Sequence, residues 1–446
     1  GLYATGSPEL LITGSDFSDN DGNGITLTAY VELDDSSTPS FIDNTMTGNG
    51  DYPLTIAANE LGQLDSSSTF SGNTKDFIEV TADYVTDDAT WQGLDVPFLV
   101  TGDIYIQGSG RPEVEIEDGA SFAFEGGAGL SVGSGNYGTL TVSGSTSGVS
   151  FSSSEASPAA GDWDGIVLGY YAEDSSMSGF IIEYGGGNGV AGLYLYYTSM
   201  ELSDCTVADN DVDGIYVTGA GADISDCSLS DNANMGLQLS SSGELDGSFD
   251  NNTVSGNGDY PILLPANSIG QLDSSSSYTG NGTDAIWVFA DTVTADATWQ
   301  ALDVDYFIDG DIYVQGTARP HVTIEDGTTF EMDAALYVGW SSYGSVEVNG
   351  TSTGVTFTSA EGSPAAGDWA GISIGYYCDD SQVDLDGVTV EYGGANGYGN
   401  IRWYYCDGGI DNSTLSDSSS YGQYRQGASP TIGTITYSNN VSGDLY

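Results

Sequence analysis

TWQGLDV at residues 90–96 begins a stretch that closes on EYGG at 183–186, and TWQALDV at 298–304 begins a second stretch that closes on EYGG at 391–394. Between those ends TGDIYIQG (101–108) becomes DGDIYVQG (309–316), RPEVEIEDG (111–119) becomes RPHVTIEDG (319–327), and SPAAGDW recurs unchanged at 157–163 and 363–369. The offset is 208 residues at both ends of the stretch and 206 at SPAAGDW. The chain is therefore predicted to be a tandem duplication with small insertions in its loops.

A shorter repeat lies inside each copy. ELSDCTVADNDVDGIYV at 201–217 is followed by ADISDCSLSDNANMGLQL at 222–239, and short apolar strands alternate with Gly, Asn and Asp corners along the whole chain. Period-two alternation between such corners predicts β-strands, and a nested short repeat is typical of a solenoid. We expect one continuous all-β solenoid with N-terminal coils at 1–50, a first copy at 51–258 and a second copy at 259–446.

Two patterns resemble known β-helix proteins. The coil FDNNTVSGNGDYPIL at 249–263 resembles the repeat of right-handed parallel β-helices of the pectate-lyase-like type. The run from GDIYVQG to GDWAGI at 310–372 is similar to a module that is common in bacterial surface β-helix proteins. The resemblance implies a right-handed parallel β-helix built from two tandem copies of about 208 residues. Such folds include lyases, adhesins and structural fibres, so the resemblance does not decide the function.

The composition is strongly acidic. Lys and Arg number 5 against 65 Asp and Glu, which gives a formal charge of −60. Nucleic acid and anionic lipid are poor partners for such a chain, because phosphate binding needs clustered basic side chains. Dense negative charge suits a halophilic protein that stays soluble in strong salt, or one that collects divalent cations outside the cell.

Export is the expectation from the rest of the sequence. No apolar run reaches the roughly 18 residues of a membrane span, and no basic and apolar leader stands at Gly1. Five Asn-x-Ser/Thr triplets suit an exported protein: Asn251, Asn281, Asn349, Asn412 and Asn440. We predict an extracellular, secreted or cell-surface protein without membrane insertion.

The basic residues do not indicate a polysaccharide lyase. The resemblance implies an Arg or Lys base beside an acidic calcium site for such an enzyme, because positive charge must stabilise the enolate. Arg111 and Arg319 occupy the same place in both copies, each before a proline, which favours one structural role played twice. The single His321 aligns with Glu113.

A glycoside hydrolase needs only two carboxylates at a suitable separation, and so many acidic residues provide accidental pairs. Asp162 and Asp164 flank Trp163, but the second copy has Ala370 in place of the second aspartate. We interpret the tryptophan as the cover of a coil corner. The sequence therefore predicts that the chain is not an enzyme.

Two loops have the spacing of calcium ligands, D-x-D-x-D-G and D-x-D-x-N-G. Their candidate ligands are Asp209, Asp211 and Asp213 in one loop and Asp19, Asp21 and Asn23 in the other. The glutamate of a complete calcium loop is missing, since Tyr30 and Ala220 stand at the twelfth position. Bound Ca²⁺ and plain solvated acidic corners both remain open.

The cysteines form two pairs by their places in the copies. Cys205 and Cys227 are 22 residues apart, one coil, and Cys378 and Cys406 occur only in the second copy. Stacked coils bring Cα atoms to about 5 Å, within the disulfide range. We expect disulfides at both places, with an internal thiol ladder as an equal alternative for Cys205 and Cys227.

Aromatic residues cluster in GLYLYY at 192–197 and IRWYYC at 401–406. Consecutive aromatic residues on a strand cannot all point inward. The predicted contact surface consists of Tyr196, Tyr197, Trp403, Tyr404 and Tyr405. Lateral packing of rods, sugar binding and simple corner packing are the three interpretations of it.

The function expected from these observations is an exported, noncatalytic structural rod that forms a surface fibre or layer. Its partners would be further copies of itself, packed laterally and head to tail, because GLYATG at 1–6 and GQYRQG at 422–427 share one phase of the repeat. The alternatives are an adhesin segment that binds glycans through its exposed aromatic residues and a polysaccharide lyase or hydrolase.

Overall fold

The computed structural model describes residues 1–28, 30–34, 39–145 and 148–446, which form two compact units. The first unit is Gly1–Gln238 with Ser255–Asp259, and the second is Leu239–Val254 with Tyr260–Tyr446. The boundary expected at 258/259 lies within the segment 239–259, where the chain alternates between the units. The single continuous solenoid stays a prediction.

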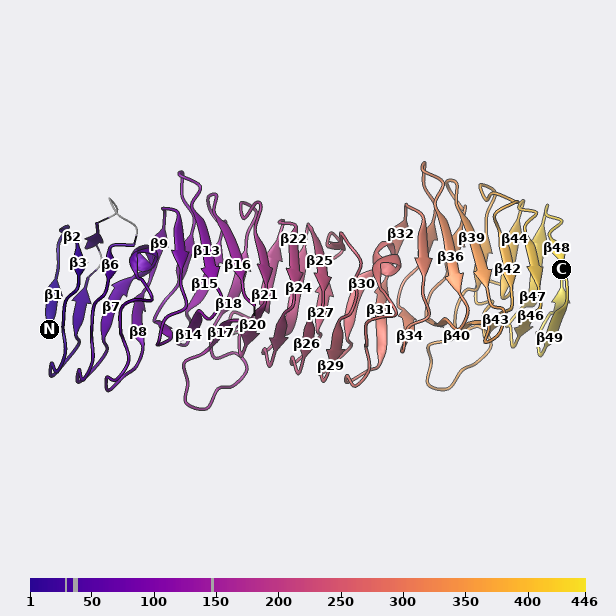
Figure 1. Ribbon diagram of the computed structural model, residues 1–446. Coiled ribbons are helices and arrows are strands. Elements are labelled where there is room, and N and C mark those ends of the chain that lie inside the picture. The colour runs from indigo at the N-terminus through magenta and orange to yellow at the C-terminus, as the bar shows by residue number, and fades with distance from the viewer. Residues whose placement is uncertain (29, 35–38, 146–147) are drawn as a thin grey trace. The chain divides into compact units, whose positions relative to one another are not determined.

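Three long parallel sheets dominate the first unit (Figure 1), and from Ile78 onward successive strands along the chain belong to different sheets. The first sheet contains β1 (Leu2–Ala4), β4 (Ile25–Leu27), β7 (Leu54–Ala57), β8 (Ile78–Thr81), β11 (Phe98–Val100), β14 (Ser121–Phe124), β17 (Val149–Ser153), β20 (Phe180–Glu183), β23 (Thr206–Ala208) and β26 (Ser228–Ser230). The second contains β9 (Asp83–Val85), β12 (Ile104–Ile106), β15 (Gly129–Val132), β18 (Gly165–Leu168), β21 (Ala191–Tyr196) and β24 (Asp213–Thr218). The third contains β10 (Ala89–Trp91), β13 (Glu113–Glu117), β16 (Thr139–Ser143), β19 (Ser176–Ser178), β22 (Met200–Ser203) and β25 (Gly221–Ser225).

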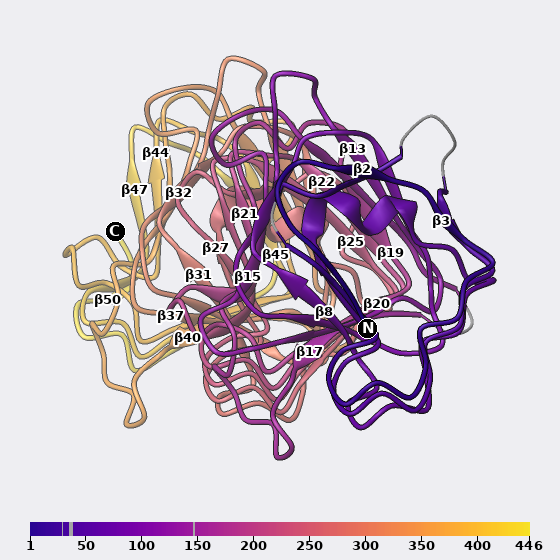
Figure 2. The ribbon, with the colours of Figure 1, turned by 90° about the vertical axis from the view of Figure 1, so that its left-hand side faces the viewer.

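The first coils also contain two short parallel pairs and a 3₁₀ helix, η1 (Ala58–Gln63). The pairs are β2 (Glu9–Leu10) with β5 (Glu32–Leu33) and β3 (Ile12–Thr13) with β6 (Phe41–Ile42). Seen from the N-terminal end, the coils of this unit wind around a common interior (Figure 2). From β8 to β25 each turn adds one strand to each of the three sheets, as a β-solenoid requires.

The second unit repeats this plan. Its first sheet contains β30 (Ile262–Pro265), β31 (Ala285–Phe289), β34 (Asp305–Ile308), β37 (Thr329–Met332), β40 (Val355–Ser359), β43 (Val388–Glu391), β46 (Ser413–Ser416) and β49 (Ile435–Ser438). The second contains β32 (Asp291–Val293), β35 (Ile312–Val314), β38 (Leu336–Val338), β41 (Ile372–Ile374), β44 (Ile401–Tyr404), β47 (Tyr421–Gln426) and β50 (Gly443–Leu445). The third contains β33 (Ala297–Trp299), β36 (His321–Glu325), β39 (Ser345–Asn349), β42 (Asp384–Asp386), β45 (Gly409–Asp411) and β48 (Thr431–Ile432).

The remaining elements are a second 3₁₀ helix, η2 (Ala266–Gln271), and three strands between residues 237 and 255. These strands are β27 (Leu237–Leu239), β28 (Glu244–Leu245) and β29 (Thr253–Ser255). η2 follows β30 as η1 follows β7, so the duplication extends to the irregular elements.

Alternating side chains fill the coils, as the period of two predicts. In β13, Val114 and Ile116 are buried while the three glutamates between and beside them are exposed. Identical positions of successive coils lie in register and stack: the ring centroids of Phe98, Phe122 and Phe151 follow one another at 5.0 and 5.4 Å. The equivalent column of the second unit stacks at 5.2 and 4.8 Å through Tyr306, Phe330 and Phe357. These columns form the apolar interior.

Ladders of hydrogen-bonded asparagines stabilise the corners of the coils. The carboxamide Nδ2 of Asn210 donates to Asn232 Oδ1 at 2.8 Å, and Asn232 Nδ2 donates to Asn257 Oδ1 at 2.9 Å. Asp209 and Asp231, one residue earlier, have φ of 54° and 56°, a conformation that Asp and Asn tolerate better than other residues. A second ladder joins Asn20, Asn49 and Asn73. In both ladders the residue before each asparagine is an aspartate or a glycine with positive φ.

Candidate contact surfaces

The exposed aromatic surface contains four of the five predicted residues and further tyrosines that were not predicted. Tyr196, Tyr197 and Tyr405 are exposed and Tyr404 is partly exposed. Trp403 is fully buried, and its indole Nε1 donates to Gln423 Oε1 at 3.0 Å, so its place in the predicted surface was wrong. Trp403 aligns with the buried Leu195 of the first copy, so the alternation of β44 turns it inward.

Each repeat carries five neighbouring tyrosines, which we name its tyrosine ridge. The first ridge is Tyr137, Tyr170, Tyr171, Tyr196 and Tyr197, and the second is Tyr343, Tyr376, Tyr377, Tyr404 and Tyr405. The sequence analysis did not predict the first three tyrosines of either ridge. The repeated GYY at 169–171 and 375–377 would have indicated two of these three tyrosines in each ridge.

The two ridges have the same internal geometry. Tyr170 meets Tyr171 edge to face with ring centroids 4.9 Å apart, and Tyr376 meets Tyr377 in the same way at 5.1 Å. Edge-to-face contacts of this kind stabilise aromatic clusters and leave ring surface free. Tyr170 is 56% exposed and Tyr376 is 60% exposed. The most outward ring of each ridge is thus held by other rings.

A glycine in the next coil receives the last ring of each ridge. Tyr197 has φ of 56°, and a Cβ on Gly219 would lie 2.4 Å from its ring. Tyr405 has φ of 54°, and a Cβ on Gly427 would lie 2.3 Å from its ring. Any larger residue at these glycines would displace the tyrosine, so both repeats reserve the same place for it.

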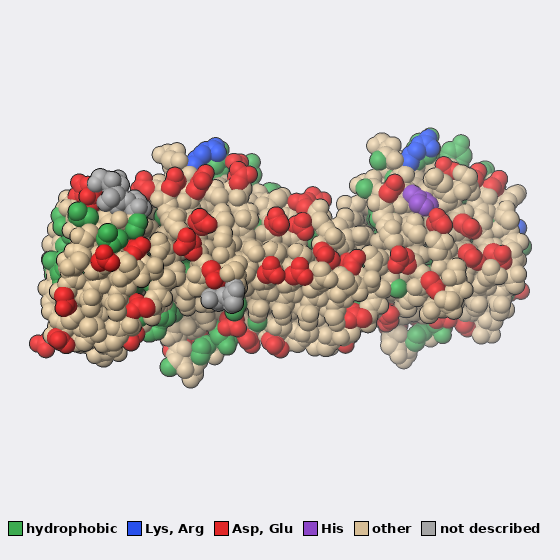
Figure 3. Space-filling model, viewed as in Figure 1, with side chains coloured by type: hydrophobic (Ala, Val, Ile, Leu, Met, Phe, Trp, Pro, Cys, Tyr) green, Lys and Arg blue, Asp and Glu red, His purple; other side chains and the backbone are tan. Residues whose placement is uncertain are grey.

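An arginine covers the first ring of each ridge. The guanidinium carbon of Arg111 lies 3.8 Å from the Tyr137 ring centroid, and that of Arg319 lies 3.9 Å from the Tyr343 ring centroid. Both arginines make the same cation–π contact, which agrees with the prediction of one structural role played twice. On the face drawn in Figure 3, basic side chains are few and acidic ones are spread over both units.

The predicted calcium ligands do not converge in the first unit. The Asp213 carboxylate is buried and accepts the Met235 N–H at 3.2 Å, and its burial raises its pKa to about 6. Among the described residues, the one group of three acidic, His or Cys ligand atoms within 4.8 Å of one another contains none of the predicted aspartates. Asn23 accepts the Tyr52 N–H through Oδ1. Calcium binding stays a prediction.

Both cysteine pairs are disulfides in the structure. Cys205 and Cys227 have Cα atoms 4.5 Å apart, and Cys378 and Cys406 have Cα atoms 6.0 Å apart. Asp380 lies beside the second pair, where the Cys378 Sγ is 3.3 Å from its Oδ1. Each bridge links neighbouring coils.

The aspartate and the tryptophan of each SPAAGDW segment make hydrogen bonds that hold the segment in place. The Asp162 carboxylate accepts Ser153 Oγ and the Ala159 N–H, and the Trp163 indole donates to the Glu183 carbonyl at 2.8 Å. Asp368 and Trp369 make the equivalent bonds in the second copy. Asp164 is different, because burial and then the charge of Asp103 raise its pKa. Trp163 is fully buried, which agrees with its interpretation as a structural residue.

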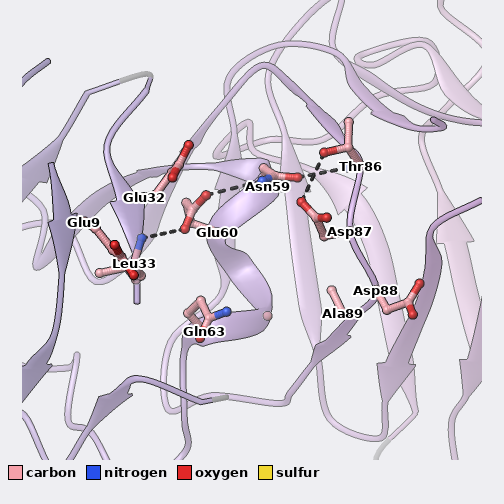
Figure 4. Close-up of a pocket in the computed structure, with 11 residues that line it drawn as sticks. Glu9, Glu32, Leu33, Asn59, Glu60, Gln63, Thr86, Asp87, Asp88 and Ala89 are labelled. Carbon is pink, nitrogen blue, oxygen red and sulfur yellow. Dashed lines mark hydrogen bonds between the residues drawn. The ribbon is translucent and has the colours of Figure 1, made fainter. Parts of the chain in front are cut away.

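A polar cavity of about 580 Å³ opens beside η1 (Figure 4). Glu9 and Glu32 lie in register on β2 and β5, and Glu60 lies on η1 with one oxygen accepting the Leu33 N–H at 2.8 Å. Burial raises the pKa of Glu60, and the nearby charges of Glu32 and Asp83 add to the effect. The sequence analysis did not predict this cavity, and the second copy has Ser268 where Glu60 stands.

No helix among the described residues has the length and apolar character needed to cross a bilayer. Residues 84–248 and 165–300 match the family described as "Right handed beta helix region". No curated protein matches the chain.

Two solved structures resemble the chain at low similarity. The catalytic domain of a GH87 alpha-1,3-glucanase, in complex with tetrasaccharides, is 11% identical with a TM-score of 0.18; the alignment covers 89% of this chain and 66% of the glucanase chain, just under two thirds of it. A mutant of the periplasmic alginate epimerase AlgG is 9% identical with a TM-score of 0.20, and the alignment covers 90% of this chain and 84% of the epimerase chain.

The prediction that the chain is not an enzyme is corrected by these structures, because both are enzymes that act on polysaccharides. At this similarity the likeness concerns the fold alone and assigns no reaction. The predicted fold class is confirmed: the family match and the stacked parallel coils show that the chain is a right-handed parallel β-helix protein.

Proposed function

We propose that the chain is an exported β-helix scaffold that holds neutral polysaccharide against its two tyrosine ridges. The observation that carries this proposal is the duplication of the ridges. Five tyrosines, one stacked arginine and one receiving glycine recur at equivalent positions, although the outermost rings contribute little to the interior. Exposed aromatic surface held in a fixed geometry is typical of a binding site.

The chemistry of the ridges favours sugar rings as the ligand. Tyrosine offers an apolar face to the C–H groups of a pyranose and a hydroxyl group to its polar edge. The formal charge of −60 repels polyanions, whereas a neutral polysaccharide meets no such repulsion. Two ridges on one chain also give a long polymer two places to bind.

Lateral packing of copies through the same ridges is the second candidate. The exposed rings of Tyr170 and Tyr376 favour it, since they would be covered in a packed layer. Repulsion between two strongly acidic chains opposes it unless salt screens the charges. This candidate therefore requires concentrated salt, and sugar binding does not.

Pull-down on insoluble cellulose, chitin and β-1,3-glucan tests the proposal. We expect the native chain to bind at least one of these polymers. The double variant Tyr170→Ala, Tyr376→Ala should bind about tenfold more weakly, which corresponds to about 1.4 kcal/mol. Tyr84→Ala is the matched control, because Tyr84 is 52% exposed but stacks on Tyr105 outside the ridges.

Failure of the native chain to bind any of the polymers, or equal binding by the double variant, would refute the sugar-binding proposal. Sedimentation velocity in dilute and concentrated sodium chloride addresses the second candidate. Association that appears in concentrated salt and is lost in the double variant would support lateral packing instead.

A further inference from the structure

In the first repeat, the ammonium group of Lys75 lies over an aromatic ring of the same chain. The Lys75 ammonium lies 4.2 Å from the Tyr52 ring centroid and 2.9 Å from Asp51 Oδ1. The hydrogen bond to Asp51 raises the pKa of Lys75. A cavity of about 400 Å³ opens beside them, with Leu99 and Glu155 in its wall. This place on the coil thus holds an alkylammonium group.

The second repeat keeps the ring and loses the lysine. The segment NTKDFIEV at 73–80 becomes NGTDAIWV at 281–288, so Thr283 stands where the first repeat has Lys75, while Tyr260 corresponds to Tyr52. Two further changes add rings, because Trp287 replaces Glu79 and Phe307 replaces Leu99. One ring is lost where Ala285 replaces Phe77, so the aromatic surface gains one ring in all.

The three aromatic residues of the second repeat form one cluster. The Tyr260 ring centroid lies 5.1 Å from that of Trp287 and 6.0 Å from that of Phe307, and the Tyr260 and Phe307 rings are stacked. Trp287 Nε1 donates to Asp309 Oδ2 at 3.1 Å, which fixes the edge of the indole. Trp287 and Phe307 are partly exposed and lie in register on β31 and β34. Their rings form a fixed platform on the outer face of the sheet.

Carboxylates replace neutral residues around this platform. Asp305, Asp309 and Glu331 stand where the first repeat has Pro97, Thr101 and Ala123. Glu331 follows Phe307 in register on β37. Within the described part of the chain, no Lys, Arg or His nitrogen lies within 4 Å of these three carboxylates. Burial raises the pKa of Asp305 and of Glu331, and the charge of Asp305 adds to the effect on Glu331.

We infer that Tyr260, Trp287, Phe307, Asp305 and Glu331 form an amine seat that binds a primary alkylammonium group of the lysine type from another molecule. The same place in the first repeat is filled by such a group from the chain itself. Loss of that lysine, together with a net gain of one ring and two carboxylates, leaves a surface that attracts an external cation. A neutral sugar would not relieve the repulsion between the carboxylates. The seat is independent of the tyrosine ridges.

Saturation-transfer NMR with n-butylammonium chloride tests the seat, with n-butanol as the uncharged probe of equal length. We expect saturable binding of butylammonium and none of butanol. Thr283→Lys should weaken that binding at least tenfold, because it restores the arrangement of the first repeat and fills the seat from within. Thr283→Gln places a neutral side chain at the same exposed position and should leave the binding unchanged.

Trp287→Leu should weaken the binding to a similar extent, and the ridge variant Tyr170→Ala, Tyr376→Ala should bind butylammonium like the native chain. The inference is overturned if butylammonium does not bind saturably, if butanol binds equally well, or if Thr283→Lys has no effect. Tighter binding of glucosamine than of butylammonium would also overturn it, since the ligand would then be an amino sugar rather than a lysine-type group. The melting temperature of each variant shows that it folds.

Discussion

Glu60 is a buried side chain whose negative charge destabilises the folded state. It is 7% exposed, it accepts the Leu33 N–H, and the second repeat has Ser268 at the same position. Burial raises its pKa above the usual value for glutamate. A raised folded-state pKa means that the folded chain holds the proton more strongly than the unfolded chain. The folded state is therefore most favoured below the unfolded pKa and loses that advantage as the pH rises through the raised folded pKa.

Replacement of Glu60 by Gln should therefore raise the melting temperature at pH 7 and leave it nearly unchanged at pH 4, where the glutamate is largely protonated in both states. Gln keeps an oxygen that can accept the Leu33 N–H. Thermal unfolding of both chains across this pH range measures the effect. Glu113→Gln is the control, because Glu113 is exposed on β13. An equal shift at both pH values would show that charge is not the cause.

At the scale of the element, β44 shows how far the sequence predicts a strand. Period-two alternation and the corner residues predicted where strands occur and which of their residues face inward, because parallel coils in register repeat the same position every turn. Because Trp403 aligns with the inward-facing Leu195, the same rule also predicts that Trp403 faces inward. The amine seat could not be predicted in the same way. Trp287 and Glu331 lie 44 residues apart in the chain and become neighbours through β34 only once the coils are stacked.

The disulfides tie neighbouring coils and give a prediction about elements. The double variant Cys205→Ala, Cys227→Ala should lower the free energy of unfolding by about 3 kcal/mol, the usual value for closing a loop of this size. Reduction, which opens both bridges, should lower it further. Denaturant unfolding with and without dithiothreitol measures it. If the native pair were a thiol ladder, reductant would have no effect on a chain that keeps only this pair.

The tryptophans at the bases of the SPAAGDW segments should be equally important to their units. Trp163→Ala removes a fully buried ring that stacks on Phe124 at 4.3 Å, and we expect a loss of about 3 to 5 kcal/mol. Trp369→Ala should cost a similar amount in the second unit. Tyr84→Ala, which removes an exposed ring, should cost much less. Urea unfolding of the three variants would contradict the prediction if their midpoints were equal.

At the scale of the whole molecule, the charge of −60 governs stability and association. Like charges on a folded chain repel, and salt at about 0.1 M screens them beyond about 10 Å. The melting temperature should therefore rise with sodium chloride. It should rise further with calcium at equal ionic strength only if the predicted loops bind that ion. Equal curves for calcium and magnesium would contradict the calcium prediction, and no salt dependence would contradict both.

Head-to-tail association also belongs to this scale and stays a prediction. Its test is sedimentation equilibrium in concentrated sodium chloride, where a monomer of 46.3 kDa at every protein concentration would contradict it. The inward-facing residues of β47 are relevant to this test. Gln423 is buried and Arg425 is partly buried, whereas the preceding coil has Ile401 and Trp403 at the same positions. A polar interior is a poorer surface for further stacking than an apolar one.

The coil-to-coil pairing also determines how the chain can reach its fold. The ladder asparagines that bond to one another are only 22 to 29 residues apart in a chain of 446. Closing such short loops costs little entropy, so a new coil can dock as soon as it emerges beside a finished one. The chain can therefore acquire its structure progressively from one end during synthesis or passage through a membrane channel, and a stalled intermediate would differ from the native protein by a whole number of turns.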